Sequence, residues 1–208
     1  MIQITGLDRV KNNDIDWLIE ANNKINNSGF ADYYDVDKNN RGMIAMRIKN
    51  TPMDVPDCKM ISMLRIIMFN EIMLDPVIGR KELADDGVIY IMDYSGFNMD
   101  LMMFWNDIKF NKLHSKITFG ALPMKVKKMI IINQPALFTT FFNLVKIFFS
   151  KKVTDRLVCV GRDYDRVIEE CGGAEYTPDI VPGGLRKMKE RMDGKEMIGY
   201  LKRIIPDY

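Results

Sequence analysis

The side chains of this 208-residue chain that could act as nucleophile, base or metal ligand are few and scattered. His114 is the single histidine. No GxSxG motif offers it a nucleophile, so a hydrolase triad is not supported. It lies in a lysine-rich segment that we expect to be a surface loop. Phosphate-binding loops of the GxGxxG or GxxxxGK type are also missing. We therefore expect no enzymatic activity, no metal site and no catalytic cofactor.

The cysteines and the acidic side chains have simple structural explanations. The cysteine count is odd and no CxxC pair occurs, which argues against a disulfide framework or a zinc site and favours a reducing compartment. Cys159 lies within an apolar run and is expected to be a small buried side chain. Turns and strand ends explain the remaining candidates for an acid pair better than catalysis does: these are Asp85, Asp86 and Asp93.

Lysine has an unusual distribution along the chain. Residues 108–154 contain no Asp or Glu but nine lysines: Lys109, Lys112, Lys116, Lys125, Lys127, Lys128, Lys146, Lys151 and Lys152. The whole chain has a net charge of +2 and this segment contributes +9, which leaves −7 for the rest. One basic zone on a dipolar protein indicates a polyanionic partner. A nucleic acid is disfavoured, because the zone lacks arginine and its phenylalanines follow a helical rather than a strand period.

The most apolar segment, residues 136–149, has the spacing of a helix. Its apolar side chains recur at intervals of three and four residues, and form one face: Phe138, Phe141, Phe142, Val145, Phe148 and Phe149. Asn143 and Lys146 interrupt it, and it is too short to span a bilayer. Lys151 and Lys152 follow directly. Phenylalanine beside lysine is typical of a helix at a membrane surface, whereas packing on a sheet is the alternative for such a stripe.

The elements around this segment alternate between strands and helices. Expected strands are residues 30–36, 42–48, 87–93, 128–132 and 156–160; expected helices are 56–74, 99–108, 136–149 and 164–171. This alternation predicts an α/β fold with a mixed, mostly parallel sheet. We expect an N-terminal helical arm (1–28) without a signal peptide, one domain (29–184) and a charged helical tail (185–208).

Four segments, in order, resemble the CRAL-TRIO, or Sec14-like, lipid-binding family. Residues 122–138 (LPMKVKKMIIINQPALF) resemble the Pro, basic cluster, buried strand and Asn-x-Pro that lead into the family's gate helix. Residues 86–96, 144–152 and 179–184 resemble its Asp-x-x-Gly strand, its K-P-F-L stretch and its closing Pro and Gly-Gly. The tocopherol-transfer and retinaldehyde-binding branch is nearest, since its Pro-x-Lys-x-Arg matches Pro123 to Lys127.

The resemblance implies a five-stranded sheet that floors a hydrophobic pocket, helices that cover it, and a mobile gate helix. It implies a bound lipid, a phospholipid, phosphoinositide or other lipid, that is exchanged at membranes by a cytoplasmic, peripherally associated protein. The partner would be a membrane surface with anionic lipids, whose headgroups match Lys125, Lys127, Lys152 and Arg156. The pocket and gate would use Ile89, Ile91, Phe104, Ile131, Phe138, Phe141, Phe142, Val145, Phe148 and Phe149.

Three departures from the family pattern leave alternatives open. Ile147 stands where the K-P-F-L stretch has its Pro, and Met124 stands where phosphatidylinositol-binding members of the yeast type have an acidic residue. The N-terminal helical subdomain is mostly missing, so a homodimer could complete the wall of the pocket. A membrane-binding adaptor that recognises phosphoinositides but transfers no lipid is therefore the alternative function.

Overall fold

The computed structural model describes residues 15–74, 86–122, 125–188 and 199. Its centre is one five-stranded sheet in the order β1-β2-β3-β4-β5. The strands are β1 (Ala31–Val36), β2 (Gly42–Arg47), β3 (Val88–Asp93), β4 (Val126–Ile132) and β5 (Leu157–Gly161). β1 runs antiparallel to β2, and the other neighbours are parallel. The predicted mixed, mostly parallel α/β fold is confirmed.

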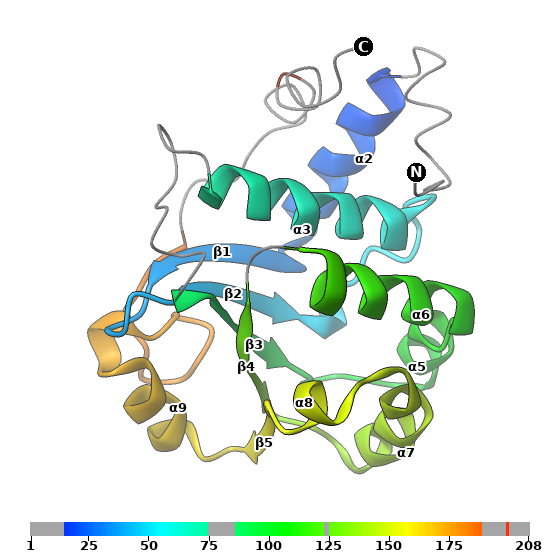
Figure 1. Ribbon diagram of the computed structural model, residues 1–208. Coiled ribbons are helices and arrows are strands. Elements are labelled where there is room, and N and C mark those ends of the chain that lie inside the picture. Colours follow the sequence, from blue (N-terminus) through cyan, green and yellow to red (C-terminus); the bar gives the residue numbers. More distant parts are fainter. Residues whose placement is uncertain (1–14, 75–85, 123–124, 189–198, 200–208) are drawn as a thin grey trace.

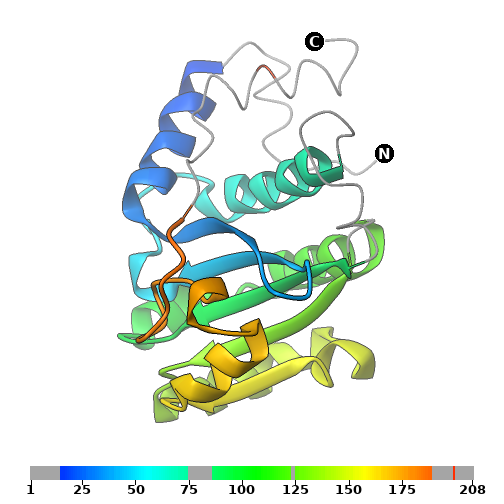
Figure 2. The ribbon, with the colours of Figure 1, turned by 90° about the vertical axis from the view of Figure 1, so that its left-hand side faces the viewer.

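The sequential strand order explains where the helices lie. Parallel strands joined in the order of the sequence need crossovers, and because these are right-handed they all fall on the same face. Here the crossover helices are α3 (Cys58–Leu74), α5 (Met99–Trp105), α6 (Ile108–Lys116), α7 (Ala136–Val145) and α8 (Lys151–Thr154). We call their side of the sheet the crossover face. Helix α2 (Ile15–Ser28) packs against α3, beyond the sheet (Figures 1 and 2).

The opposite side, which we call the α9 face, is covered by α9 (Tyr164–Cys171) and the segment that follows it. Along each strand, successive side chains point alternately to the α9 face and to the crossover face, as the period of two requires. Both sets are apolar, because a parallel sheet covered on both sides has near-continuous hydrophobic strands. The buried residues of the α9 face are Tyr34, Met43, Ala45, Ile89, Ile91, Ile130, Ile132, Val167, Cys171 and Val181.

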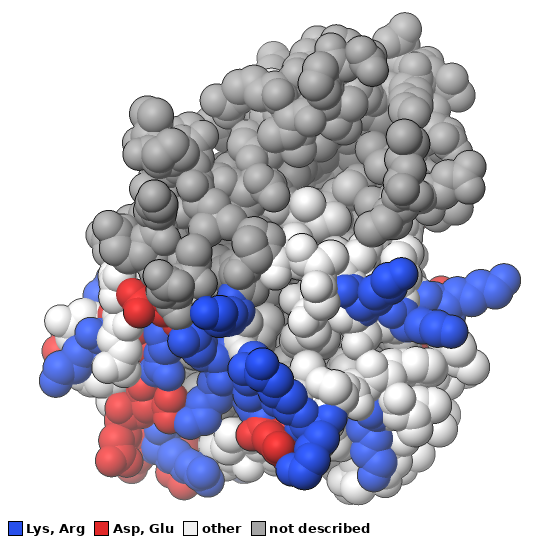
Figure 3. All heavy atoms as spheres, in the orientation of Figure 1, with Lys and Arg blue, Asp and Glu red and all other residues white. Residues whose placement is uncertain are grey.

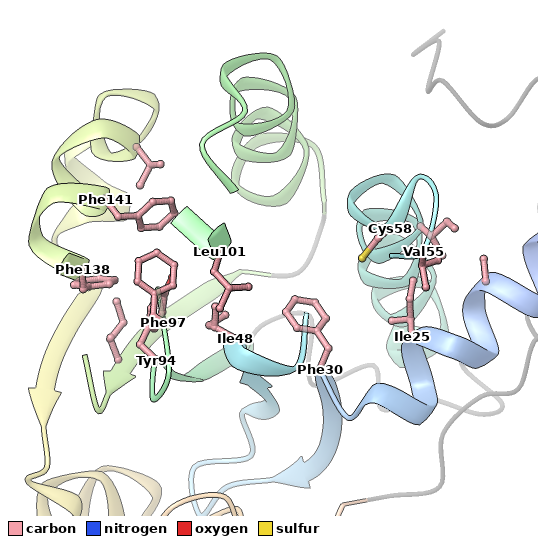
Figure 4. Packing of buried hydrophobic residues seen from close by; sticks show 14 of the residues in the cluster. Ile25, Phe30, Ile48, Val55, Cys58, Tyr94, Phe97, Leu101, Phe138 and Phe141 are labelled. Atoms are coloured by element: carbon pink, nitrogen blue, oxygen red, sulfur yellow. The ribbon is translucent and has the colours of Figure 1, made fainter. Parts of the chain in front are cut away.

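Helix α7 turns its phenylalanine stripe inward. Phe138 meets Tyr94 edge to face at 4.6 Å between ring centroids, and Phe141 lies 5.1 Å from Phe97 (Figure 4). This aromatic contact anchors the start of α7 on the turn that follows β3. The α-helix ends at Val145 and continues as a 3₁₀ turn, η3 (Lys146–Phe148), instead of reaching Phe149. Ser150 then caps the next helix, α8, by accepting a hydrogen bond from the Val153 amide.

Two other segments differ from the sequence prediction. The helix expected over 99–108 ends at Trp105, because Asp107 caps a separate helix, α6, by accepting from the Phe110 amide. The lysine-rich segment around His114 is therefore helix and not loop. Cys159 is exposed rather than buried, because β5 is the edge strand and no described element covers this side chain. The prediction that residues 156–160 form a fully buried strand was wrong.

Candidate ligand-binding cavity and basic edge

A cavity of about 390 Å³ lies between the crossover face of the sheet and helices α3, α6 and α7. This volume is within the range of small-molecule sites, about 300–1,000 Å³. The floor is mostly aliphatic and rich in methionine, a flexible side chain that adapts to ligands of different shape. The floor residues from the strands β2 to β5 are Ile44, Met46, Tyr90, Met92, Met129, Ile131 and Leu157.

Two sets of contacts fix the α7–η3 segment beside the cavity. At one end, Phe138 and Phe141 of α7 pack on Tyr94 and Phe97. At the other end, the Ser115 hydroxyl of α6 donates to the Phe148 carbonyl at 2.7 Å, and the Phe119 and Phe149 rings meet at 5.7 Å. Between these two sets of contacts, the helices do not pack directly on the sheet, and the cavity lies in the space between them.

Six of the ten predicted pocket and gate residues line this cavity: Ile131, Phe138, Phe141, Phe142, Val145 and Phe149. Phe148 is half-buried outside it, and Phe104 packs against Trp105 under the Lys59 ammonium group. Ile89 and Ile91 are fully buried on the α9 face, so their assignment to the pocket was wrong. In a strand buried on both sides, the sequence alone does not reveal which alternate residues face which layer.

The cavity wall also carries a few polar side chains that sequence reasoning did not select. Asp32 pairs with Arg47 at 2.7 Å, and the Arg65 guanidinium donates to the Asn26 side chain at 2.6 Å. His114 was expected on the surface but lines the cavity, where burial lowers the pKa of its imidazole to about 4. It is therefore neutral at physiological pH.

The topology brings the four predicted headgroup residues to one edge of the sheet. Lys125 and Lys127 lie at the start of β4, Lys152 is in α8, and Arg156 directly precedes β5. The crossover from β4 through α7 leaves at the carboxyl end of β4 and returns to the amino end of β5, so all four positions meet at the amino ends of these parallel strands. We call these four residues the basic edge.

Backbone contacts fix this edge. The Arg156 guanidinium donates to the Val126 carbonyl, between the two lysines of β4. The β3–β4 register skips Lys127, which makes it the extra residue of a β-bulge, a device that re-aims a side chain. Gly87, with φ +73°, permits the close approach of β3, because a Cβ there would lie 2.2 Å from the Lys125 carbonyl oxygen.

The lysines of the basic edge differ in pairing from their neighbour Lys128. Among the described residues, no acidic side chain forms an ion pair with Lys125, Lys127 or Lys152, whereas Lys128 pairs with Glu170 on the α9 face. Figure 3 shows Lys and Arg side chains gathered around the positions of α8 and β5. Unpaired cations gathered at one edge are suited to bind an anionic group.

The outer side of the α7–η3 segment is unusually apolar for a surface. Leu144 is 43% exposed and Ile147 is 73% exposed. Lys146 lies beside them and hydrogen-bonds Asn143 at 2.7 Å. Phe142, which could equally have faced outward, lines the cavity and stacks on Phe138.

The described part of the chain holds neither a helix suited to span a membrane nor a metal-binding cluster. None of its helices is both long enough and apolar enough to cross a bilayer. Within the same residues, no group of three or more His, Cys, Asp or Glu side chains is arranged to hold a metal ion.

A family model and individual known proteins indicate the same family for this chain. The sequence model of the CRAL/TRIO domain matches residues 26–180. Alpha-tocopherol transfer protein-like of Mus musculus is 24% identical over 90 residues, and its Homo sapiens counterpart 23%, each match covering 43% of this chain and 26% of the relative. The chain thus matches about a quarter of the length of these curated relatives.

The fold is also shared with a solved structure. The crystal structure of Sfh5 superposes with a TM-score of 0.52 at 12% identity, covering 86% of this chain and 65% of that one. A match at this identity supports the fold alone. The family model spans most of the chain and includes the strands and helices that enclose the cavity. The chain therefore belongs to the CRAL/TRIO domain family.

Proposed function

We propose that this protein binds a lipid in the cavity of the crossover face and exchanges it at membrane surfaces. The observation that carries this proposal is the cavity itself, about 390 Å³ in volume and lined mainly by apolar side chains. A space of this kind gains stability when hydrocarbon fills it, at about 25 cal/mol per Å² of apolar surface removed from water. The relatives named alpha-tocopherol transfer protein-like support the same class of ligand.

The α7–η3 segment is the proposed gate. Phe138, Phe141 and Phe142 line the cavity from its inner side, and Leu144 and Ile147 face outward. Its end is held to α6 and η2 by the Ser115–Phe148 hydrogen bond and the Phe119–Phe149 ring contact. Insertion of Leu144 and Ile147 into a bilayer would compete with these few contacts, and thereby open a path from the cavity to the hydrocarbon core.

The basic edge is proposed to hold an anionic lipid headgroup, such as that of a phosphoinositide, during this exchange. Each lysine near an anionic leaflet contributes about 1 kcal/mol of attraction. Lys125, Lys127 and Lys152 are available for this role because no described acid pairs with them. The attraction of the protein to the membrane, and the binding and release of the lipid, then need no covalent step.

A paired charge reversal tests the basic edge. Lys125→Glu with Lys127→Glu should weaken co-sedimentation with phosphoinositide-containing vesicles at least tenfold, since each change replaces attraction by repulsion. The matched control is Lys109→Glu with Lys112→Glu, two exposed lysines of α6 from the same acid-free segment. Equal binding by the wild type and the first variant, with unchanged circular dichroism, would remove the headgroup assignment.

A membrane-binding adaptor is the second candidate, and one observation favours it. Buried side chains pack directly beside the basic edge: Val88 and Val126, the first residues of β3 and β4, and Val153 of α8. Headgroup binding there does not require an open cavity. Transfer of a fluorescent phospholipid between vesicles separates the two functions: transfer that Met129→Trp blocks by filling the cavity floor supports exchange, whereas vesicle binding without any transfer supports the adaptor.

A further inference from the structure

One wall of the cavity carries polar side chains that have no hydrogen-bond partner among the described residues. His114 and Thr118 are four residues apart on the continuous α6–η2 segment, so they lie on one side of it, and both line the cavity. Thr118 is 4% exposed, and within the described part of the chain its hydroxyl is buried without a hydrogen-bond partner. Burial lowers the pKa of His114, and no charge or hydrogen bond from the described residues acts on that pKa as well.

The local helix geometry accounts for the unpaired hydroxyl. A threonine in an α-helix commonly bonds to the carbonyl four residues earlier. Here Thr118 lies instead in a π-helical turn, η2 (Ile117–Ala121), whose backbone geometry differs from that of the α-helix. π-turns of this kind recur at functional sites. A buried hydroxyl without a partner lowers stability, so its presence calls for a compensating role.

We propose that His114 and Thr118 form a hydrogen-bonding subsite for one uncharged polar group, a hydroxyl or a carbonyl, at the end of a hydrocarbon ligand. This inference rests on the proposed function, because it assumes that the cavity is filled by a ligand. It adds which wall the polar end of that ligand contacts and what chemistry this end has.

The donor and acceptor pattern selects an uncharged group. A neutral imidazole offers one donor and one acceptor, and a threonine hydroxyl can rotate between two χ1 positions in a helix to donate or accept. The Phe110 ring stacks on His114 at 5.6 Å and holds its orientation. A charged end placed here would lack a counter-ion beside it, because no charge among the described residues acts on the His114 pKa. Of the two charged lining residues, Asp32 pairs with Arg47 and Arg65 donates to Asn26.

The experiment compares ligands that differ only at one end. Tetradecan-1-ol, tetradecane and tetradecanoic acid compete with diphenylhexatriene for the cavity, and fluorescence gives the three affinities. The wild type should bind the alcohol about tenfold more tightly than the alkane, and should bind the ionised acid weakly. Thr118→Val should abolish most of the preference for the alcohol, Thr118→Ser should retain it, and the exposed control Thr140→Val should leave it unchanged.

The stability of the empty protein gives an independent readout. Because Thr118→Val removes an unsatisfied hydroxyl and keeps the shape of the side chain, we expect the ligand-free variant to melt about 2–4 °C above the wild type. Equal affinity of the wild type for alcohol and alkane, or a preference that Thr118→Val retains, would overturn the subsite. If the wild type takes up none of the three ligands, the proposed lipid binding itself fails, and the two failures are thus distinguishable.

Discussion

The two faces of the sheet are built from similar residues but are covered in different ways. On the α9 face, Ile89, Ile91 and Ile130 pack against α9 with at most 2% exposure, and Glu170 joins Arg41 and Lys128 in one ion-pair network. On the crossover face, Ile44, Tyr90 and Met129 lie under a cavity of about 390 Å³. The α9 face is filled and its polar network is paired, whereas the crossover face leaves room for a ligand.

The two faces therefore differ in role: the α9 face contributes stability, and the crossover face offers a place for a ligand. Strands β2 to β5 contribute side chains to both faces in alternation. A substitution on one face can therefore be compared with a matched substitution on the other face of the same sheet. Close packing maximises dispersion contacts and gives the α9 face its stability. The crossover face lacks some of these contacts, and a bound hydrocarbon would supply them. Each of the following predictions contrasts one face with the other.

The largest expected effect is a matched isoleucine truncation. Ile91→Ala should lower the free energy of unfolding by about 3–4 kcal/mol, because it leaves a cavity in a filled core. Ile44→Ala, on the cavity floor, should cost only about 1–2 kcal/mol, since part of its surface already faces open space. Urea unfolding of both ligand-free variants measures the two costs. Equal costs would mean that the faces are packed alike.

The next effect is a pH dependence that belongs to the crossover face. His114 has a pKa of about 4 in the folded protein and about 6.5 when unfolded. The unfolded chain therefore binds the extra proton first, and stability is lost as the pH falls from 6.5 to about 4. The loss should reach about 3 kcal/mol in the ligand-free protein. His114→Phe should flatten the stability curve over this window, and an unchanged slope would place the titration elsewhere.

A smaller effect, at lower pH, belongs to the α9 face. Burial raises the pKa of Glu170, but hydrogen bonds and charge from Lys128 and Arg41 outweigh it, so the pKa lies below the ordinary 4.5. The carboxylate then stabilises the fold above pH 4.5, and this contribution disappears as the pH falls through the lowered value. Glu170→Gln should cost about 1 kcal/mol at pH 7 and almost nothing in acid, by thermal unfolding at both pH values. A cost independent of pH would indicate lost packing instead.

The smallest effect on stability should occur at the gate surface. Ile147→Ser changes a side chain that is 73% exposed, so the free energy of unfolding should move by less than about 0.5 kcal/mol. Binding to anionic vesicles should nevertheless fall about fivefold. Leu185→Ser, at a residue 66% exposed elsewhere, provides the control for a general loss of surface hydrophobicity. A similar loss of vesicle binding in both variants would contradict a specific docking surface at η3.

Much of the fold was predictable because it depends on local patterns. Apolar runs bounded by Gly and Asp indicated β3, and the intervals of three and four residues indicated α7 and an apolar stripe on one of its faces. The family resemblance implied that Lys125, Lys127 and Arg156 act together, and the order of strands and helices explains why they meet. These features are set by periodicity and topology, which the sequence records directly.

The rest depended on contacts that no local pattern encodes. Ile89 was assigned to the wrong face because both faces of β3 are buried. His114 was placed in a loop because the Asp107 cap of α6 was not recognised, and its position on the cavity wall needs the tertiary packing of α6. Cys159 looked buried because an edge strand and a central strand can have the same apolar composition. The fit of helices to sheet, and thus the cavity, arises only when all layers are assembled.

Native mass spectrometry of the purified protein, before and after extraction with organic solvent, tests the central claim most directly. We expect one hydrophobic molecule per chain, released by the extraction, and much lower occupancy in Met129→Trp, whose larger side chain fills the cavity floor. A wild-type protein that carries no such molecule, and acquires none from lipid vesicles, would contradict the assignment of the cavity to a lipid.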